Sequence, residues 1–138
     1  MPRQGRSRSV GPSQVQGYAA KAQEYVEAAA AELKADRTIA VTSLAIHAAI
    51  NAADAVCGAR LGRRAAGGTH EQVLTLLRDA GRDGAEVEKH LRRLLPLKTK
   101  TEYELDDIPV SAAAGAVERA EQCVTIALRL AAVAPQDR

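Results

Sequence analysis

The sequence predicts an all-α protein in which long helices pack as one bundle with roughly antiparallel neighbours. Alanine supplies 29 of the 138 residues, and it favours helix while adding little volume. No proline occurs between Ser13 and Leu95, so most of the chain lacks the strongest helix breaker. The apolar residues recur at steps of three and four, which is the helical period. The length fits a single domain with one core.

We expect five helices, at residues 13–33, 36–59, 69–80, 85–95 and 111–133, joined by a loop at 60–68 and an irregular segment at 96–110. Asp36 is predicted to cap the second helix and Ser111 the last one. Thr69 and Gln72 have the spacing of a capping box at the start of the short third helix. Pro96 is expected to end the fourth helix.

The second helix is predicted to be the central one. From Thr38 to Ala53 it has no charged residue on any face, and such a helix is normally enclosed by others. This run is too short and too polar to predict a membrane span. One stripe of the helix carries Ile39, Ser43, Ile46, Ile50, Ala53 and Cys57, and its neighbour carries Ala40, Leu44, His47, Asn51 and Asp54.

The last helix has a stripe of small residues, at Ala113, Val117, Ala120, Val124, Ala127 and Ala131. Small side chains allow close helix contacts. Further apolar positions outside this stripe indicate a second buried surface, either a homodimer contact or irregular packing within one bundle. We expect the homodimer.

The basic charge of the chain belongs to its first residues. Residues 1–12 carry three arginines and no acid, which leaves −1 of the total +2 for residues 13–138. We expect residues 1–12 to be a disordered basic tail, 13–133 the helical domain and 134–138 a disordered C-terminus. No signal peptide is apparent, and Cys57 and Cys123 fit small core residues in a reducing cytoplasm.

Two groups of polar residues are candidates for a site. His47, Asn51 and Asp54 share a helix face, so they could converge in a polar pocket, or they could satisfy one another and the backbone. Lys98, Lys100 and Tyr103 lie in the segment 94–110, which is either a solvated connection or a loop that holds these side chains beside the central helix. No metal-ligand spacing, glycine-rich phosphate loop or nucleophile signature occurs, so we predict no metal and no cofactor.

Taken together, the segments AVTSLAIHAAINAADAVCGARLG, THEQVLTLLRDAG and LRRLLPLKTKTEYELDDIPVSAAAGAVERAEQCVTIALRL resemble a HEPN domain (higher eukaryotes and prokaryotes nucleotide-binding) over residues 13–133. The resemblance implies an up-and-down four-helix bundle with one short accessory helix, usually dimeric. It also implies a place among toxin–antitoxin, defence and RNA-processing systems, with a nucleotidyltransferase-type protein as a partner.

Many HEPN domains are metal-independent ribonucleases with an Arg, four to six residues and a His near the start of the last helix. This chain has no His after His90, and although five residues separate Arg64 from His70, that pair lies after the second helix. We therefore expect a noncatalytic member that binds a nucleotide, RNA or a partner protein near His47, Asn51, Asp54, Lys98, Lys100 and Tyr103. One alternative is a divergent ribonuclease with His47 as acid or base, and another is a structural interaction module.

Overall fold

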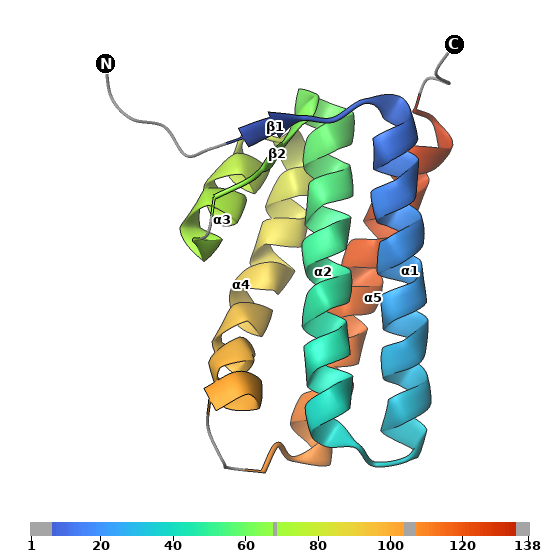
Figure 1. Cartoon of the computed structure of the whole chain (residues 1–138), viewed down its shortest axis with the longest axis vertical. Coiled ribbons are helices and arrows are strands. Elements are labelled where there is room, and N and C mark those ends of the chain that lie inside the picture. Colours follow the sequence, from blue (N-terminus) through green and yellow to red (C-terminus); the bar gives the residue numbers. More distant parts are fainter. Residues whose placement is uncertain (1–6, 68, 104–106, 135–138) are drawn as a thin grey trace.

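In the described part of the chain, five helices and two very short strands make up the regular structure (Figure 1). The computed structural model describes residues 7–67, 69–103 and 107–134, apart from the side chains of residues 102 and 103. The helices are α1 (Pro12–Lys34), α2 (Thr38–Leu61), α3 (His70–Arg78), α4 (Gly81–Tyr103) and α5 (Val110–Ala132), and the strands are β1 (Ser7–Ser9) and β2 (Arg63–Ala65). The predicted all-α class is confirmed, with a small sheet added to it.

The central helix is α2, as its uncharged run predicts. It packs against α1, α4 and α5, and it also contacts α3 and β2 (Figure 1). Within the described residues it is the one helix long and apolar enough to cross a membrane. However, 67% of its most apolar window is buried by the rest of the protein, as in the core helix of a soluble protein.

Small side chains let the helices approach one another closely. Ala45, Ala49 and Ala52 of α2 are fully buried, and bulk comes from a few larger residues such as Leu91 of α4. The predicted stripe of α5 is confirmed, because all six of its members are buried: Ala113, Val117, Ala120, Val124, Ala127 and Ala131. In the stripe predicted for α2, Ile39 differs, since it lies in the first turn and is 52% exposed.

The N-terminal segment belongs to the fold from residue 7 onward, so the expected disordered tail over residues 1–12 is wrong for residues 7–12. β1 pairs antiparallel with β2, and the N–H of Val10 donates to the carbonyl of Gly62 at 2.9 Å. The side chain of Val10 is only 6% exposed. It packs on Gly58, where a Cβ atom would lie 2.6 Å from Cγ1 of Val10. Composition could not predict this order, because β2 and Gly62, with which the segment pairs, lie more than fifty residues further along the chain.

Helix α4 continues to Tyr103, although the sequence predicted an irregular segment from Pro96. Proline cannot donate to the carbonyl of Arg92, but both residues are exposed, so water can satisfy that carbonyl. The continued helix also packs Leu97 against the core, one turn beyond the buried Leu94. Tertiary packing therefore outweighs the helix-breaking tendency of the proline.

Two helix starts differ from the predicted caps. Asp36 has a left-handed backbone, with φ of 57°, because it lies in the turn that ends α1, and its N–H donates to the carbonyl of Leu33. Arg37 is instead the N-cap of α2. Likewise α5 begins one residue before Ser111, with Pro109 as its N-cap, since the fixed φ of proline suits the extended residue before a helix.

Both cysteines are core residues, as predicted. Cys57 and Cys123 are free thiols and are buried. Burial raises the pKa of each thiol to about 12, and the charge of Asp54 also raises the pKa of Cys57. Neither thiol is therefore suited to act as a nucleophile at neutral pH.

Candidate functional site

A polar pocket of about 260 Å³ lies where α2, β2, α3 and α4 meet. It combines one carboxylate, two cations, an imidazole and a hydroxyl with an apolar floor. Its walls are formed by Ile50, Asp54, Arg64, Ala65, Ala66, Gly67, Thr69, His70, Val73, Leu91, Leu95 and Lys98. These residues come from four elements and from the loop between β2 and α3, so the pocket exists only in the folded protein.

Asp54 supplies the carboxylate of this site, and its pKa is strongly perturbed. It lies on α2 one turn after Ile50, on the side of the central helix that faces the pocket. Burial raises the pKa of Asp54 from 3.8 to about 6, although the positive charges of Arg64 and Lys21 oppose this rise. The carboxyl group therefore changes its protonation state near neutral pH, which is typical of functional sites.

Arg64 is held beside Asp54 by the small sheet. It lies on β2 directly opposite Arg8 of β1, and its Nη1 donates to the carbonyl of Ala65 at 3.2 Å. Its guanidinium carbon also lies 5.6 Å from the centre of the Tyr18 ring on α1, which is a cation–π contact. Strand pairing and this contact together fix a cation at the edge of the pocket.

The third wall is the start of α3. Thr69 is the N-cap residue, as predicted, but its side chain makes no capping hydrogen bond, so the predicted capping box is wrong. The side chain of Gln72 lies against Gly67 instead, where a Cβ atom would collide with it. His70 in the first turn also borders the pocket. The first turn of a helix carries backbone N–H groups without intrahelical partners, and this favours anions.

Lys98 completes the pocket from α4. It is half-buried, and its carbonyl accepts a hydrogen bond from the hydroxyl of Thr101 at 2.9 Å. Lys98 reaches this place because α4 continues through Pro96. The helix thus brings a lysine from the segment predicted to be irregular to the central helix.

The other predicted site residues do not border this pocket. His47 is exposed, and its Nδ1 lies 2.8 Å from the carbonyl of Ser43, so Nδ1 carries the proton and Nε2 is the acceptor of the neutral ring. Asn51 is buried, and its Nδ2 donates to the carbonyl of His47 at 2.8 Å. Of the two interpretations of this helix face, these hydrogen bonds bear out the second, in which His47 and Asn51 are satisfied by the backbone, and neither residue borders the pocket beside Asp54. Lys100 is exposed, and the side chain of Tyr103 lies outside the described residues.

Sequence reasoning missed Arg64, His70 and Thr69 as pocket residues. The five-residue interval between Arg64 and His70 was visible, but nothing local indicated that the loop between them folds back over Asp54. The signal that could have found them is the combination of an arginine, two glycines and a helix start directly after the central helix.

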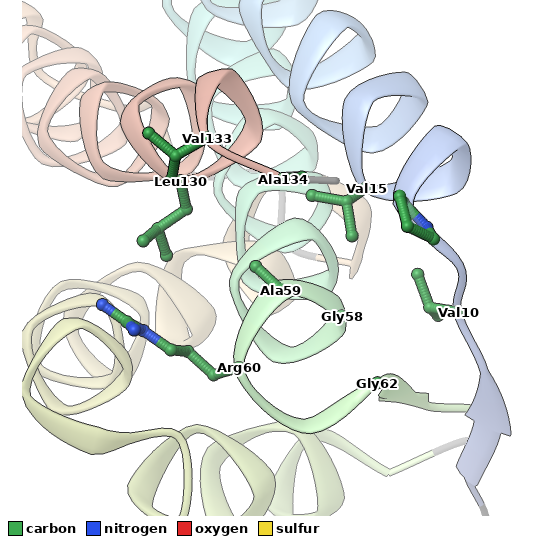
Figure 2. A pocket seen from close by; sticks show the side chains of 10 residues that line it. Val10, Val15, Gly58, Ala59, Arg60, Gly62, Leu130, Val133 and Ala134 are labelled. Atoms are coloured by element: carbon green, nitrogen blue, oxygen red, sulfur yellow. The ribbon is translucent and has the colours of Figure 1, made fainter. Parts of the chain in front are cut away.

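Two other cavities lie elsewhere on the fold. One of about 420 Å³ lies between the start of α1 and the ends of α2 and α5, and it is lined mainly by Val, Ala, Leu and Gly (Figure 2). In this view the side chain of Arg60 extends away from Val10 and Val15, and its Nη2 donates to Asp83 of α4 at 2.5 Å. The other, of about 500 Å³, is an open groove beside His90 and Arg119. Among the described residues, no group of three His, Cys, Asp or Glu side chains could hold a metal ion.

No protein-family model matches the chain, and no characterised protein matches it. The resemblance to HEPN domains therefore rests on the residues of this chain alone.

Proposed function

We propose that the chain is a HEPN-like domain that binds a phosphate-bearing ligand, a nucleotide or RNA, in the pocket beside Asp54 without cleaving it. The observation that carries this proposal is the presence of Arg64 and Lys98, from two different elements, on the walls of one cavity. In this proposal the four long helices form the up-and-down bundle of the family, and α3 is its accessory helix. The protein is a cytoplasmic homodimer, and a nucleotidyltransferase-type protein of a toxin–antitoxin or defence system is its partner.

The chemistry of the walls favours a phosphate over a neutral ligand. A guanidinium group can bind two phosphate oxygens at once, and an ammonium group adds a point charge. The first turn of α3 adds backbone N–H donors at the same cavity. Because the pKa of Asp54 is about 6, a bound anion can shift its carboxyl to the neutral form at little cost, and a neutral carboxyl donates a hydrogen bond.

Charge removal on α4 gives the sharpest test. Lys98→Gln should weaken the binding of a nucleoside triphosphate or a short RNA, measured by titration calorimetry, by about tenfold or more, as expected for a hydrogen bond to a charged group. Lys100→Gln is the matched control, because it also removes one positive charge from α4. Lys100 lies two residues after Lys98, is exposed and does not border the pocket. Equal losses in both variants, or no binding by the wild type, would contradict the proposed site.

A divergent ribonuclease is a second candidate, favoured by one observation. Asp54, with a pKa of about 6, shares the pocket with His70 and Arg64, so a proton acceptor, a proton donor and a cation are available together. His47 borders no part of this pocket, so His70 replaces it in this candidate. If the protein is a ribonuclease, it should cleave RNA in the presence of a chelator, and Asp54→Asn and His70→Ala should each lower the rate by about a hundredfold or more. Binding without cleavage would favour the first function. If the protein neither binds nor cleaves RNA, a structural interaction module is the function that remains.

A further inference from the structure

A row of planar and basic side chains runs along the seam between α1 and α2, next to the pocket. At one end the guanidinium carbon of Arg64 lies 5.6 Å from the centre of the Tyr18 ring. At the other end the ring centres of Tyr25 and His47 are 5.5 Å apart, with a tilt of 33°. Both tyrosines are half-buried and His47 is exposed, so these residues are in contact with solvent.

The two ends of the row lie on continuous helix faces. Tyr18, Lys21 and Tyr25 follow one another at steps of three and four, so they share one face of α1. His47 and Asp54 are seven residues apart and share a face of α2. Lys21 is exposed, and its charge lowers the pKa of Asp54, so the row and the pocket are electrostatically connected. A seven-residue interval corresponds to about 10 Å along the helix axis.

Packing alone does not explain this choice of residues. Aromatic residues form only 2% of the chain, and bulk on its helix flanks comes elsewhere from Leu, Val and Ile. Nevertheless Tyr18 and Tyr25, the two tyrosines whose side chains are described, both occur in this row, Tyr18 beside the guanidinium of Arg64 and Tyr25 beside the imidazole of His47. Aromatic faces alternating with cations form the usual platform for single-stranded nucleic acid, since every base has a face that can stack.

We propose that this row is a track for single-stranded nucleic acid that extends from the pocket. A phosphate occupies the pocket beside Arg64, one base stacks near Tyr18, and a following base stacks on Tyr25 and His47. Lys21 lies between these positions and contacts the sugar–phosphate backbone. This inference rests on the proposed function and narrows its ligand from a mononucleotide to a strand of several nucleotides.

Tyr25 provides the test, because it borders no part of the pocket. Labelled oligouridylates of two, four and eight nucleotides, and single-stranded DNA of the same lengths, are titrated with the wild type and four variants by fluorescence anisotropy. Affinity should rise with length. Tyr25→Leu should weaken binding of the eight-nucleotide strand by about tenfold or more, the scale of one lost base stack, and Tyr25→Phe should restore it. Thermal unfolding checks that the leucine variant is folded. Lys21→Gln tests the lysine of the row, and its charge control is Lys34→Gln, because Lys34 is exposed at the end of α1.

The outcomes separate the track from the pocket. If uridine monophosphate and the longest strand bind equally well and Tyr25→Leu changes neither, the track is overturned while the pocket stands. If Tyr25→Leu weakens strand binding and Lys98→Gln does not, the track stands and the proposed pocket is wrong. Tyr25→Phe binding as weakly as Tyr25→Leu would also overturn the inference, because the phenylalanine keeps the stacking face. Equal affinity for RNA and DNA supports a track that contacts only bases and phosphates. A higher affinity for RNA supports a track that also contacts the 2′-hydroxyl.

Discussion

Replacing Asp54 by Asn should stabilise the protein at neutral pH, although it removes a charge that lies near Arg64 and Lys21. Burial disfavours the ionised carboxylate and raises its pKa from 3.8 to about 6. The two nearby positive charges oppose this rise, so the net effect already includes their attraction. Asparagine has nearly the shape of a neutral aspartic acid and, like it, offers a donor and an acceptor.

The expected size follows from linkage between protonation and folding. A rise in pKa from 3.8 to about 6 corresponds to about 3 kcal/mol, at about 1.4 kcal/mol for each tenfold change in the acid constant. Because the pKa is higher in the folded state, the stability that comes from protonated Asp54 is fully present below pH 3.8. It is lost as the pH rises through 6. The variant should therefore exceed the wild type by about 3 kcal/mol at pH 7.5 and by roughly half of that at pH 5.

Urea unfolding at several pH values between 4.5 and 8 measures this difference. Asp36→Asn is the control, because Asp36 is exposed and Asn tolerates its left-handed backbone. The control should show no comparable gain in stability at pH 7.5. A carbon-13 titration of the side-chain carboxyl of Asp54 reports its pKa independently.

Two results would contradict a raised pKa at Asp54. An Asp54→Asn variant less stable than the wild type at pH 7.5 would show that the charge of Asp54 is needed for folding. A second result would be a difference in the free energy of unfolding between variant and wild type that stays constant from pH 5 to pH 8. It would show that Asp54 has an ordinary pKa and that burial does not bring its titration close to neutral pH.

Other predictions concern stability and reactivity. Val10→Ala should lower the free energy of unfolding in urea by about 1–2 kcal/mol, because Val10 is buried. Gly58→Ala should also destabilise the protein, since its Cβ would lie 2.6 Å from Cγ1 of Val10. The double variant should lose less free energy of unfolding than the sum of the two single losses, and strictly additive losses would argue against this contact. Cys57 and Cys123 should resist a disulfide reagent at pH 8 until urea unfolds the protein, and fast labelling of the native state would contradict their burial. Arginines of α2 and α5 hold the pKa of Asp83 below its ordinary 3.8, so Asp83→Asn should destabilise at pH 7. This difference should vanish as the pH falls through the lowered pKa, and a loss that persists in acid would point to packing instead.

The helices and the place of the central one could be predicted from the sequence alone. Alanine content and the three-and-four periodicity are local properties, so α1, α2 and α5 begin and end within about two residues of their predicted limits. The uncharged run in α2 also identified the helix that others enclose, because burial excludes charge whatever the arrangement of the neighbours. Asp54 was recognised as a candidate from a face of this helix, whereas Lys98 was recognised from the segment 94–110, which was expected to be irregular.

The assembly of the site, in contrast, depends on contacts between distant parts of the chain. The pairing of β1 with β2 depends on two segments separated by two helices, and no local pattern encodes it. The continuation of α4 through Pro96 depends on core contacts of Leu97, which outweigh the missing hydrogen bond and bring Lys98 to the pocket. Likewise Arg64 and His70 approach Asp54 because the chain turns back over α2, whereas His47 bonds to its own helix. Helix formation is local and could be read from the sequence, but the convergence of side chains from four elements is a property of packing.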